Sequence, residues 1–221
     1  MTYFFQIYWR DDQAKEFFEW TLPYKNEGLT PFFENSVIID IFDRYMFNSD
    51  DKIGVFSWNL RNKMKSNVPP YRKLSLEVIE SDYDVLSFTK NTVNHGMLHL
   101  AENWHKGFWE IINEIWVKLG FGKAFEAKYP IYQNAFMARY DVYNTYLKEV
   151  LRPAMELMEN DPSIKEKCWK DSNYYKLKGS QELSERVKKY LGVNYCPMHT
   201  FLCERMFSLW LNDRNLKVVY L

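Results

Sequence analysis

The sequence predicts an α/β protein in which a sheet is followed by a helical C-terminal part. Short segments rich in aromatic and β-branched residues alternate with segments of helical periodicity, and the later part of the chain carries mainly helical patterns. Hydrophobic residues make up 47 % of the 221 residues, which is enough for a full core and excludes wholesale disorder. The length fits a single domain, 1–221, and no repeat or linker divides it.

The first half of the chain contains three predicted strands. Residues 2–9 are dense in aromatic and β-branched side chains, and residues 52–58 and 84–88 follow the same pattern. Between the first two strands, residues 11–22 have a helical apolar face that Pro23 closes. The apolar spacing over 37–45 favours a helix, although the run VIIDIF within it is also compatible with a strand.

The second half is predicted to be mainly helical. Apolar residues at helical spacing indicate a long helix over 99–119, ended by glycines, and another over 141–158 that Pro153 bends or breaks. A last amphipathic helix covers 198–211. Two segments remain, a link or short strand over 129–136 and a charged, exposed connection with its own short helix over 165–189.

Charge and cysteine content narrow the class of protein. Basic and acidic residues number 29 each, so no overall field attracts nucleic acid or an anionic membrane, and only a local basic patch could do so. The three cysteines show no metal-type pairing and are interpreted as reduced thiols. The N-terminus lacks the pattern of a signal peptide, and no apolar run approaches a membrane span. We therefore expect a cytoplasmic protein without a transmembrane segment.

An ion pair lies within the last predicted helix. Glu204 and Arg205 interrupt an otherwise apolar segment, MHTFLCERMFSLWL. Charges in such a helix must be paired or must face a ligand, because burying them alone is costly. Both interpretations, a structural ion pair and a functional one, remain open from the spacing.

Two further groups of charged residues are candidates for phosphate or metal binding. Arg61, Lys63 and Lys65 follow the strand 52–58, where an open α/β sheet binds ligands, so they suit a phosphate or diphosphate unless they form only a solvated loop. Asp82 and Asp84 form an Asp-x-Asp triplet of the kind that holds Mg²⁺ or Mn²⁺. The triplet precedes a predicted strand, however, whereas a metal-binding pair should end one.

The histidines and the known catalytic motifs add little. His95 and His99 could share a helix face, but nothing nearby completes a metal site. His199 is close enough to Glu204 to help position an acceptor hydroxyl. No Ser-His-Asp arrangement, glycine-rich phosphate loop or dinucleotide fingerprint is present.

Four segments, in this order, carry a resemblance to a known family. They are KIGVFSWNLRNK, DYDVLSF, YQNAFMARYDVYNTYLKEVLRP and ERMFSLWL. Together they resemble small bacterial glycosyltransferases of capsule and lipopolysaccharide gene clusters, which have a truncated GT-A-like (Rossmann-like) nucleotide-sugar-binding sheet. The resemblance implies a donor-binding part over 1–128 and an acceptor-side helical part over 129–221. The family's histidine-tyrosine-arginine-arginine core is replaced here by Ser57, Trp58, Asn59, Leu60 and Arg61.

The resemblance also implies roles for individual residues. Glu204, with Arg205, is the expected base or acceptor-hydroxyl anchor. The expected acceptor-side residues are Asn134, Arg139 and His199. The expected donor-side residues are Gln6, Tyr8, Arg10, Ser57, Arg61, Lys63 and Asp84, with Asp82 and Asp84 as candidate ligands for Mn²⁺ or Mg²⁺.

The expected reaction is transfer of a sugar from a nucleotide-diphosphate sugar to a hydroxyl acceptor. The acceptor that the resemblance implies is a surface glycan. The alternative acceptor is a hydroxymethylated base of phage DNA, which is supported by a basic strip from Arg61 through Arg72 and Lys73. A non-catalytic, aromatic-rich glycan- or protein-binding module and a nucleotide-binding hydrolase are the alternatives. Metal dependence, stereochemistry and oligomeric state stay open from the sequence.

Overall fold

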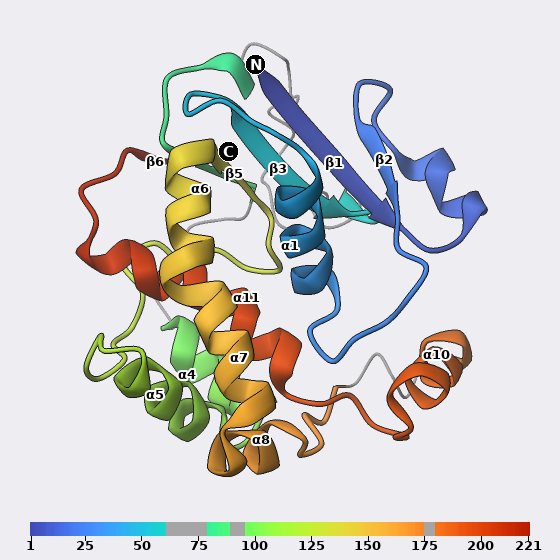
Figure 1. Cartoon of the computed structure of the whole chain (residues 1–221), viewed down its shortest axis with the longest axis vertical. Helices are drawn as coiled ribbons and strands as arrows, with labels where there is room; N and C mark the ends of the chain where they lie inside the picture. Colours follow the sequence, from blue (N-terminus) through green and yellow to red (C-terminus); the bar gives the residue numbers. More distant parts are fainter. Residues whose placement is uncertain (61–78, 89–95, 175–179) are drawn as a thin grey trace.

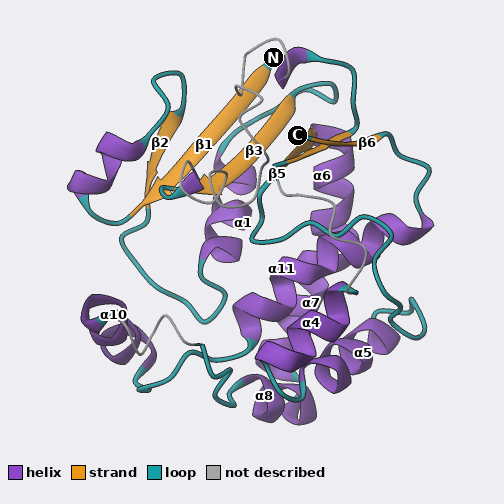
Figure 2. Cartoon of the chain, turned by 180° about the vertical axis from the view of Figure 1, so that it is seen from behind, coloured by secondary structure: helices purple, strands orange, loops and turns teal. Residues whose placement is uncertain are grey.

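A computed structural model describes residues 1–60, 79–88, 96–174 and 180–221. Six strands form one mixed sheet in the order β2-β1-β3-β5-β4-β6, and helices pack against it and below it (Figures 1 and 2). The predicted α/β class is therefore confirmed. Among the described residues, no helix has the length and apolar character needed to cross a membrane.

The directions of the strands determine which strand ends lie at the same edge of the sheet. The strands are β1 (Thr2–Tyr8), β2 (Leu22–Lys25), β3 (Lys52–Ser57), β4 (Val85–Ser87), β5 (Phe136–Arg139) and β6 (Val218–Tyr220). β1 runs parallel to β2 and β3, β5 runs antiparallel to β3 and β4, and β4 runs parallel to β6. The carboxyl ends of β1, β2, β3, β4 and β6 therefore share one edge with the amino end of β5.

The central strands are buried on both faces, which explains their nearly continuous apolar sequences. Successive side chains of a strand point to opposite faces, so Phe5 joins the larger core cluster while Phe4 joins the smaller one. Val55 and Phe56 divide in the same way. Helices α1 (Glu34–Arg44) and α6 (Tyr140–Tyr146) cover the face of the larger cluster (Figure 1). The segment 37–45, ambiguous from its sequence, is thus mostly helical.

The segment after β1 differs from its prediction. Instead of a helix over 11–22, it forms a short 3₁₀ helix, η1 (Asp11–Glu16), and then the strand β2. Pro23 lies in this strand, paired with Gln6. A proline has no N–H for a ladder, but an edge strand tolerates this because one of its sides has no neighbour. Pro23 therefore sits inside a strand rather than ending a helix.

The remaining helices form a layer below the sheet (Figure 2). They are α4 (Met97–Trp104), α5 (Phe108–Lys118), a π-helical turn η3 (Leu147–Leu151), α7 (Arg152–Asn160), α8 (Pro162–Cys168), α10 (Gln181–Leu191), α11 (His199–Trp210) and the 3₁₀ turn η4 (Leu211–Asp213). The last predicted helix is confirmed as α11. The boundary predicted at residue 128 does not separate the layers, since β5 and β6 belong to the sheet and α4 and α5 to the helical layer.

Two predicted helices differ from a single regular α-helix for identifiable reasons. The helix expected over 99–119 is two helices, because Gly107 adopts a left-handed φ of 87° between α4 and α5. The helix expected over 141–158 is continuous from α6 to α7 but contains the π turn η3 directly before Pro153. A π turn changes the backbone pairing locally, so the chain accommodates a proline without breaking the helix.

Candidate functional site

The carboxyl edge of the sheet contains a topological switch point. β2 and β3 lie on opposite sides of β1, and the chain crosses from one side to the other through α1. Open α/β sheets bind ligands in the crevice outside the carboxyl ends of the strands at such a point. Here Ile7 and Ser57 are register partners, and the Trp58 N–H donates to the Ile7 carbonyl at 2.8 Å. The residues that follow β1 and β3 are therefore neighbours.

Two aromatic rings stand at this switch point. The Trp9 and Trp58 rings lie edge to face with their centroids 6.1 Å apart. Tyr8, the last residue of β1, packs edge to face against Phe17 with centroids 5.5 Å apart. Of these side chains, only Tyr8 was predicted as a donor contact. Trp9 and Trp58 could have been identified from the sequence, because each is an aromatic residue at the end of a predicted buried strand.

Gln6 is buried beneath the switch point and organises the loop after η1. Its Oε1 accepts hydrogen bonds from the Phe18 N–H at 2.9 Å and from the Thr21 hydroxyl at 3.1 Å. The side chain is fully buried. Gln6 therefore supports the loop that leads to β2, rather than presenting its amide to a ligand as the resemblance implied.

Two buried polar atoms near the same edge lack a hydrogen-bond partner among the described residues, Gln13 Nε2 and Ser57 Oγ. The other atom of the Gln13 amide, Oε1, accepts from the backbone N–H groups of Trp9 at 3.0 Å and Arg10 at 3.2 Å. A buried polar group left unpaired costs about 1–3 kcal/mol, so it needs an explanation such as a ligand. Ser57 was predicted to contact the nucleotide-sugar donor, whereas Gln13 was not among the predicted site residues.

Helix α10 covers the residues that follow β1. Glu182 accepts a hydrogen bond from the Trp9 indole N–H at 3.3 Å and forms an ion pair with Arg10, which also pairs with Asp12. The Arg186 guanidinium lies over the Trp9 ring, 4.8 Å from its centroid. A cavity of about 290 Å³ lies here, lined by Trp9, Asn26, Glu27, Glu182, Glu185, Arg186, Lys189 and Tyr190. At the carboxyl end of β1 the Trp9 indole thus lies between a cation over its ring, Arg186, and a carboxylate at its N–H, Glu182.

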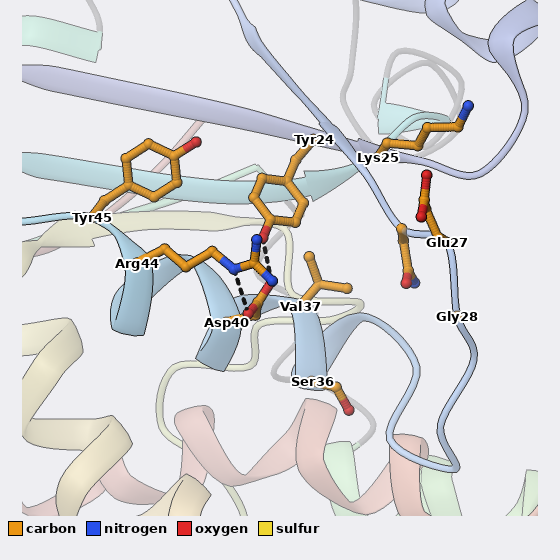
Figure 3. A pocket seen from close by; sticks show the side chains of 10 residues that line it. Tyr24, Lys25, Glu27, Gly28, Ser36, Val37, Asp40, Arg44 and Tyr45 are labelled. Atoms are coloured by element: carbon orange, nitrogen blue, oxygen red, sulfur yellow. Dashed lines mark hydrogen bonds and ion pairs between the residues drawn. The ribbon is translucent and has the colours of Figure 1, made fainter.

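A larger cavity of about 590 Å³ lies between β2 and α1 (Figure 3). Two of its charged groups pair with each other: Asp40 accepts from the Tyr24 hydroxyl and from Arg44 Nε, the latter at 2.7 Å. Burial and the hydrogen bond to Asp40 raise the pKa of Tyr24 to about 12. None of the predicted site residues that the structure describes lines this cavity.

Glu204 and Arg205 form an ion pair, with a distance of 2.6 Å between Glu204 Oε2 and Arg205 Nη1. Arg205 is 4 % exposed, and its Nη1 also donates to the Phe201 carbonyl at 3.3 Å. One turn further along α11, the Ser208 hydroxyl accepts from the Ile131 N–H at 2.8 Å. Helix α11 therefore lies against the segment that enters β5 at the carboxyl edge.

Asn134 belongs to that segment. It precedes β5, whose amino end lies at the carboxyl edge of the parallel strands, and it adopts a left-handed φ of 52°. Its Nδ2 donates to Asn35 Oδ1 at 3.1 Å. Asn134, which is 5 % exposed, and the helix that carries Glu204 therefore both approach the carboxyl edge.

Three predicted residues lie at the opposite edge. Arg139 ends β5 and pairs with Asp84 at 2.9 Å and with Asp141 at 2.7 Å, while Asp82 pairs with Lys217 at 2.7 Å. Asp82 and Asp84 precede β4, so their carboxylates are held by cations at the amino edge and do not fit a metal ion that binds a diphosphate at the carboxyl edge. In the part of the chain that the structure describes, no group of three or more His, Cys, Asp and Glu residues could hold a metal ion.

His199 is fully buried and offers no surface to an acceptor. Its ring packs edge to face between Phe32 and Trp169, with centroid distances of 5.1 and 5.2 Å. Neither ring nitrogen has a hydrogen-bond partner among the described residues. Burial, with a smaller contribution from Lys165, lowers the pKa of His199 from 6.5 to about 4.

The buried His199 gives a prediction for stability. Between pH 6.5 and about 4 the unfolded chain binds a proton at His199 that the folded chain does not. The free energy of unfolding should therefore fall as the pH drops through this window, by up to about 3 kcal/mol. Urea unfolding at stepped pH measures this, and His199→Leu should flatten the dependence. His99→Gln, at an exposed position, is the matched control; an unchanged slope in His199→Leu would contradict the assignment.

Arg61 and Lys63, the predicted diphosphate ligands, lie outside the described residues, as do Arg72 and Lys73. Comparison of the chain with known protein families, with curated proteins and with solved structures finds no match.

Proposed function

We propose that this protein is a nucleotide-sugar-dependent glycosyltransferase with a truncated GT-A-like fold. The observation that carries the proposal is the β1/β3 switch point, where Gln13 Nε2 and Ser57 Oγ are buried without a partner among the described residues. Ligands of open α/β sheets bind at such points. The order of motifs that resembles the glycosyltransferase family supports the same function independently of this geometry.

The donor is proposed to bind along the ends of β1 and β3. An aromatic face suits a nucleobase or a sugar, and Trp9 and Trp58 provide such faces. Guanidinium groups suit a diphosphate, and Arg10 and Arg186 lie beside Trp9. The Ser57 hydroxyl, which is unpaired among the described residues, would form a hydrogen bond with a polar group of the donor.

The acceptor is proposed to lie toward Asn134 and Glu204. In the transfer, the bond between the sugar's anomeric carbon and the diphosphate oxygen breaks, and its electron pair leaves with the nucleoside diphosphate. The acceptor oxygen forms the new bond to that carbon, and Glu204 takes the acceptor proton. The acceptor class is a surface glycan by family default, and we place the reaction in the cytoplasm, with which the buried, free thiols of the three cysteines agree.

Thermal unfolding with a panel of nucleotide sugars, each with and without Mn²⁺, tests the donor site. A donor at about 100 times its dissociation constant should stabilise the protein by roughly 2.7 kcal/mol. Trp9→Ala should remove this stabilisation, whereas Tyr45→Ala, in the cavity of Figure 3, should keep it.

Three outcomes would count against the proposal. Stabilisation by no nucleotide sugar would argue against a donor site. Binding of glycans alone would favour a non-catalytic module. Release of nucleotide without any acceptor would favour a hydrolase.

A further inference from the structure

Apolar side chains are exposed around the turn between α4 and α5. Among the described residues, nine large apolar side chains are exposed, and four of them fall within 104–125. They are Trp104, Trp109, Val117 and Phe125, with Phe125 70 % exposed and Trp104 57 % exposed. We name these four residues the aromatic patch.

Hydrogen bonds and helical spacing bring the patch residues together. Trp109, Asn113 and Val117 are four residues apart on α5, so they share one face of that helix. The Ala124 N–H donates to Asn113 Oδ1 at 3.1 Å, which places Phe125 beside that face. Trp104 ends α4 and Trp109 is the second residue of α5, so the two flank the α4–α5 turn in the chain. Helices α4 and α5 lie on the side of the helical layer away from β2 (Figures 1 and 2).

Two of the glutamates in this region, Glu102 and Glu126, are compensated by backbone amide groups. Glu102 accepts from the backbone N–H groups of Gly107 and Trp109, both at 2.8 Å, at the start of α5. Glu126 accepts from the N–H groups of Leu98 at 2.8 Å and His99 at 2.9 Å, at the start of α4. A carboxylate at a helix N-terminus is compensated by the amide groups and the helix dipole.

The lysines in the same region are not neutralised. Lys106 lies between Trp104 and Trp109, and Lys123 lies two residues before Phe125. Both are exposed and have no carboxylate partner among the described residues. Lys106 and Lys123 therefore add unpaired positive charge beside the patch, where the exposed Glu110 is itself paired with Lys167 at 2.7 Å. The whole chain has a formal net charge of zero.

We propose that the aromatic patch docks onto an anionic phospholipid bilayer. Tryptophan and phenylalanine insert at the boundary between head groups and acyl chains, while lysines beside them bind the anionic head groups. Exposed indole rings beside unpaired lysines are the combination that an anionic lipid surface binds. The contact is peripheral and independent of the proposed sugar transfer.

Sedimentation of the full chain with vesicles tests the proposal. Binding should be stronger to vesicles of phosphatidylglycerol and phosphatidylcholine than to phosphatidylcholine alone, and should weaken with salt. The double variants Trp104→Ser/Phe125→Ser and Lys106→Glu/Lys123→Glu should each lower the partition coefficient about tenfold or more. Met46→Ser/Lys148→Glu, at exposed positions elsewhere, should bind as the wild type does.

Three results would overturn the proposal. They are absence of binding to anionic vesicles, equal binding by the patch variants, and equal binding to neutral vesicles. Light scattering adds a discriminating readout. If the chain dimerises and Trp104→Ser/Phe125→Ser abolishes the dimer without any vesicle binding by the wild type, the patch joins two copies and the lipid proposal is wrong. Thermal unfolding of each variant confirms that it folds.

Discussion

Replacing Glu204 by glutamine is expected to lower the turnover of sugar transfer by about 10²–10⁴-fold, the contribution typical of a general base. The amide cannot take the acceptor proton, but its oxygen can still accept the hydrogen bond that Arg205 Nη1 donates at 2.6 Å in the wild type. The protein should therefore stay folded while it loses activity. Steady-state rates with the donor found by thermal unfolding measure the effect.

The alanine variant separates the structural role of Glu204 from its chemical role. Glu204→Ala leaves Arg205, which is 4 % exposed, without a carboxylate, and breaking such a pair costs about 3–5 kcal/mol. Loss of activity in Glu204→Ala alone would therefore prove nothing about catalysis. Glu110→Gln, at an exposed glutamate paired with Lys167, is the matched control and should retain the full rate. Full turnover by a folded Glu204→Gln would remove Glu204 as the base.

Strands and helices with strong periodicity could be predicted from the sequence. β1 and β3 are covered on both faces, so their apolar runs identify them, and α11 has the helical spacing of a buried helix. β2 could not be predicted, because an exposed edge strand of four residues that contains Pro23 has no alternating pattern. β6 was also not predicted, because it is an edge strand of only three half-buried residues and has no alternating pattern.

Only those parts of the candidate site that join residues close together in the sequence could be predicted. The ion pair between Glu204 and Arg205 joins adjacent residues, and the pairing of these charges is confirmed. The position of Arg139 could not be predicted from the sequence, because it depends on the antiparallel direction of β5 in the sheet. The contact between Trp9 and Glu182 joins residues 173 positions apart, which no spacing argument reaches.

Phe207→Ala should produce the largest loss of stability, about 3–5 kcal/mol of unfolding free energy. Phe207 is 2 % exposed on α11, and its ring stacks on Phe136 of β5 with centroids 3.9 Å apart. It also meets Tyr146 edge to face at 4.9 Å. Because these contacts join the helical layer to the middle of the sheet, the cavity should weaken the packing of both. Guanidinium unfolding, with an unchanged dependence on denaturant, measures the loss.

Two control variants locate the origin of that loss. Phe207→Leu keeps most of the apolar volume and should cost clearly less than Phe207→Ala, whereas Phe125→Ala removes an exposed ring and should change stability by no more than about 0.5 kcal/mol. A loss below about 1.5 kcal/mol in Phe207→Ala would mean that the layers close over the cavity. The contact between α11 and β5 would then contribute less to stability than the ring stacking of Phe207 on Phe136 implies. The stability of Phe207→Ala is therefore a test of how strongly the packing of α11, the helix that carries Glu204, against β5 stabilises the fold.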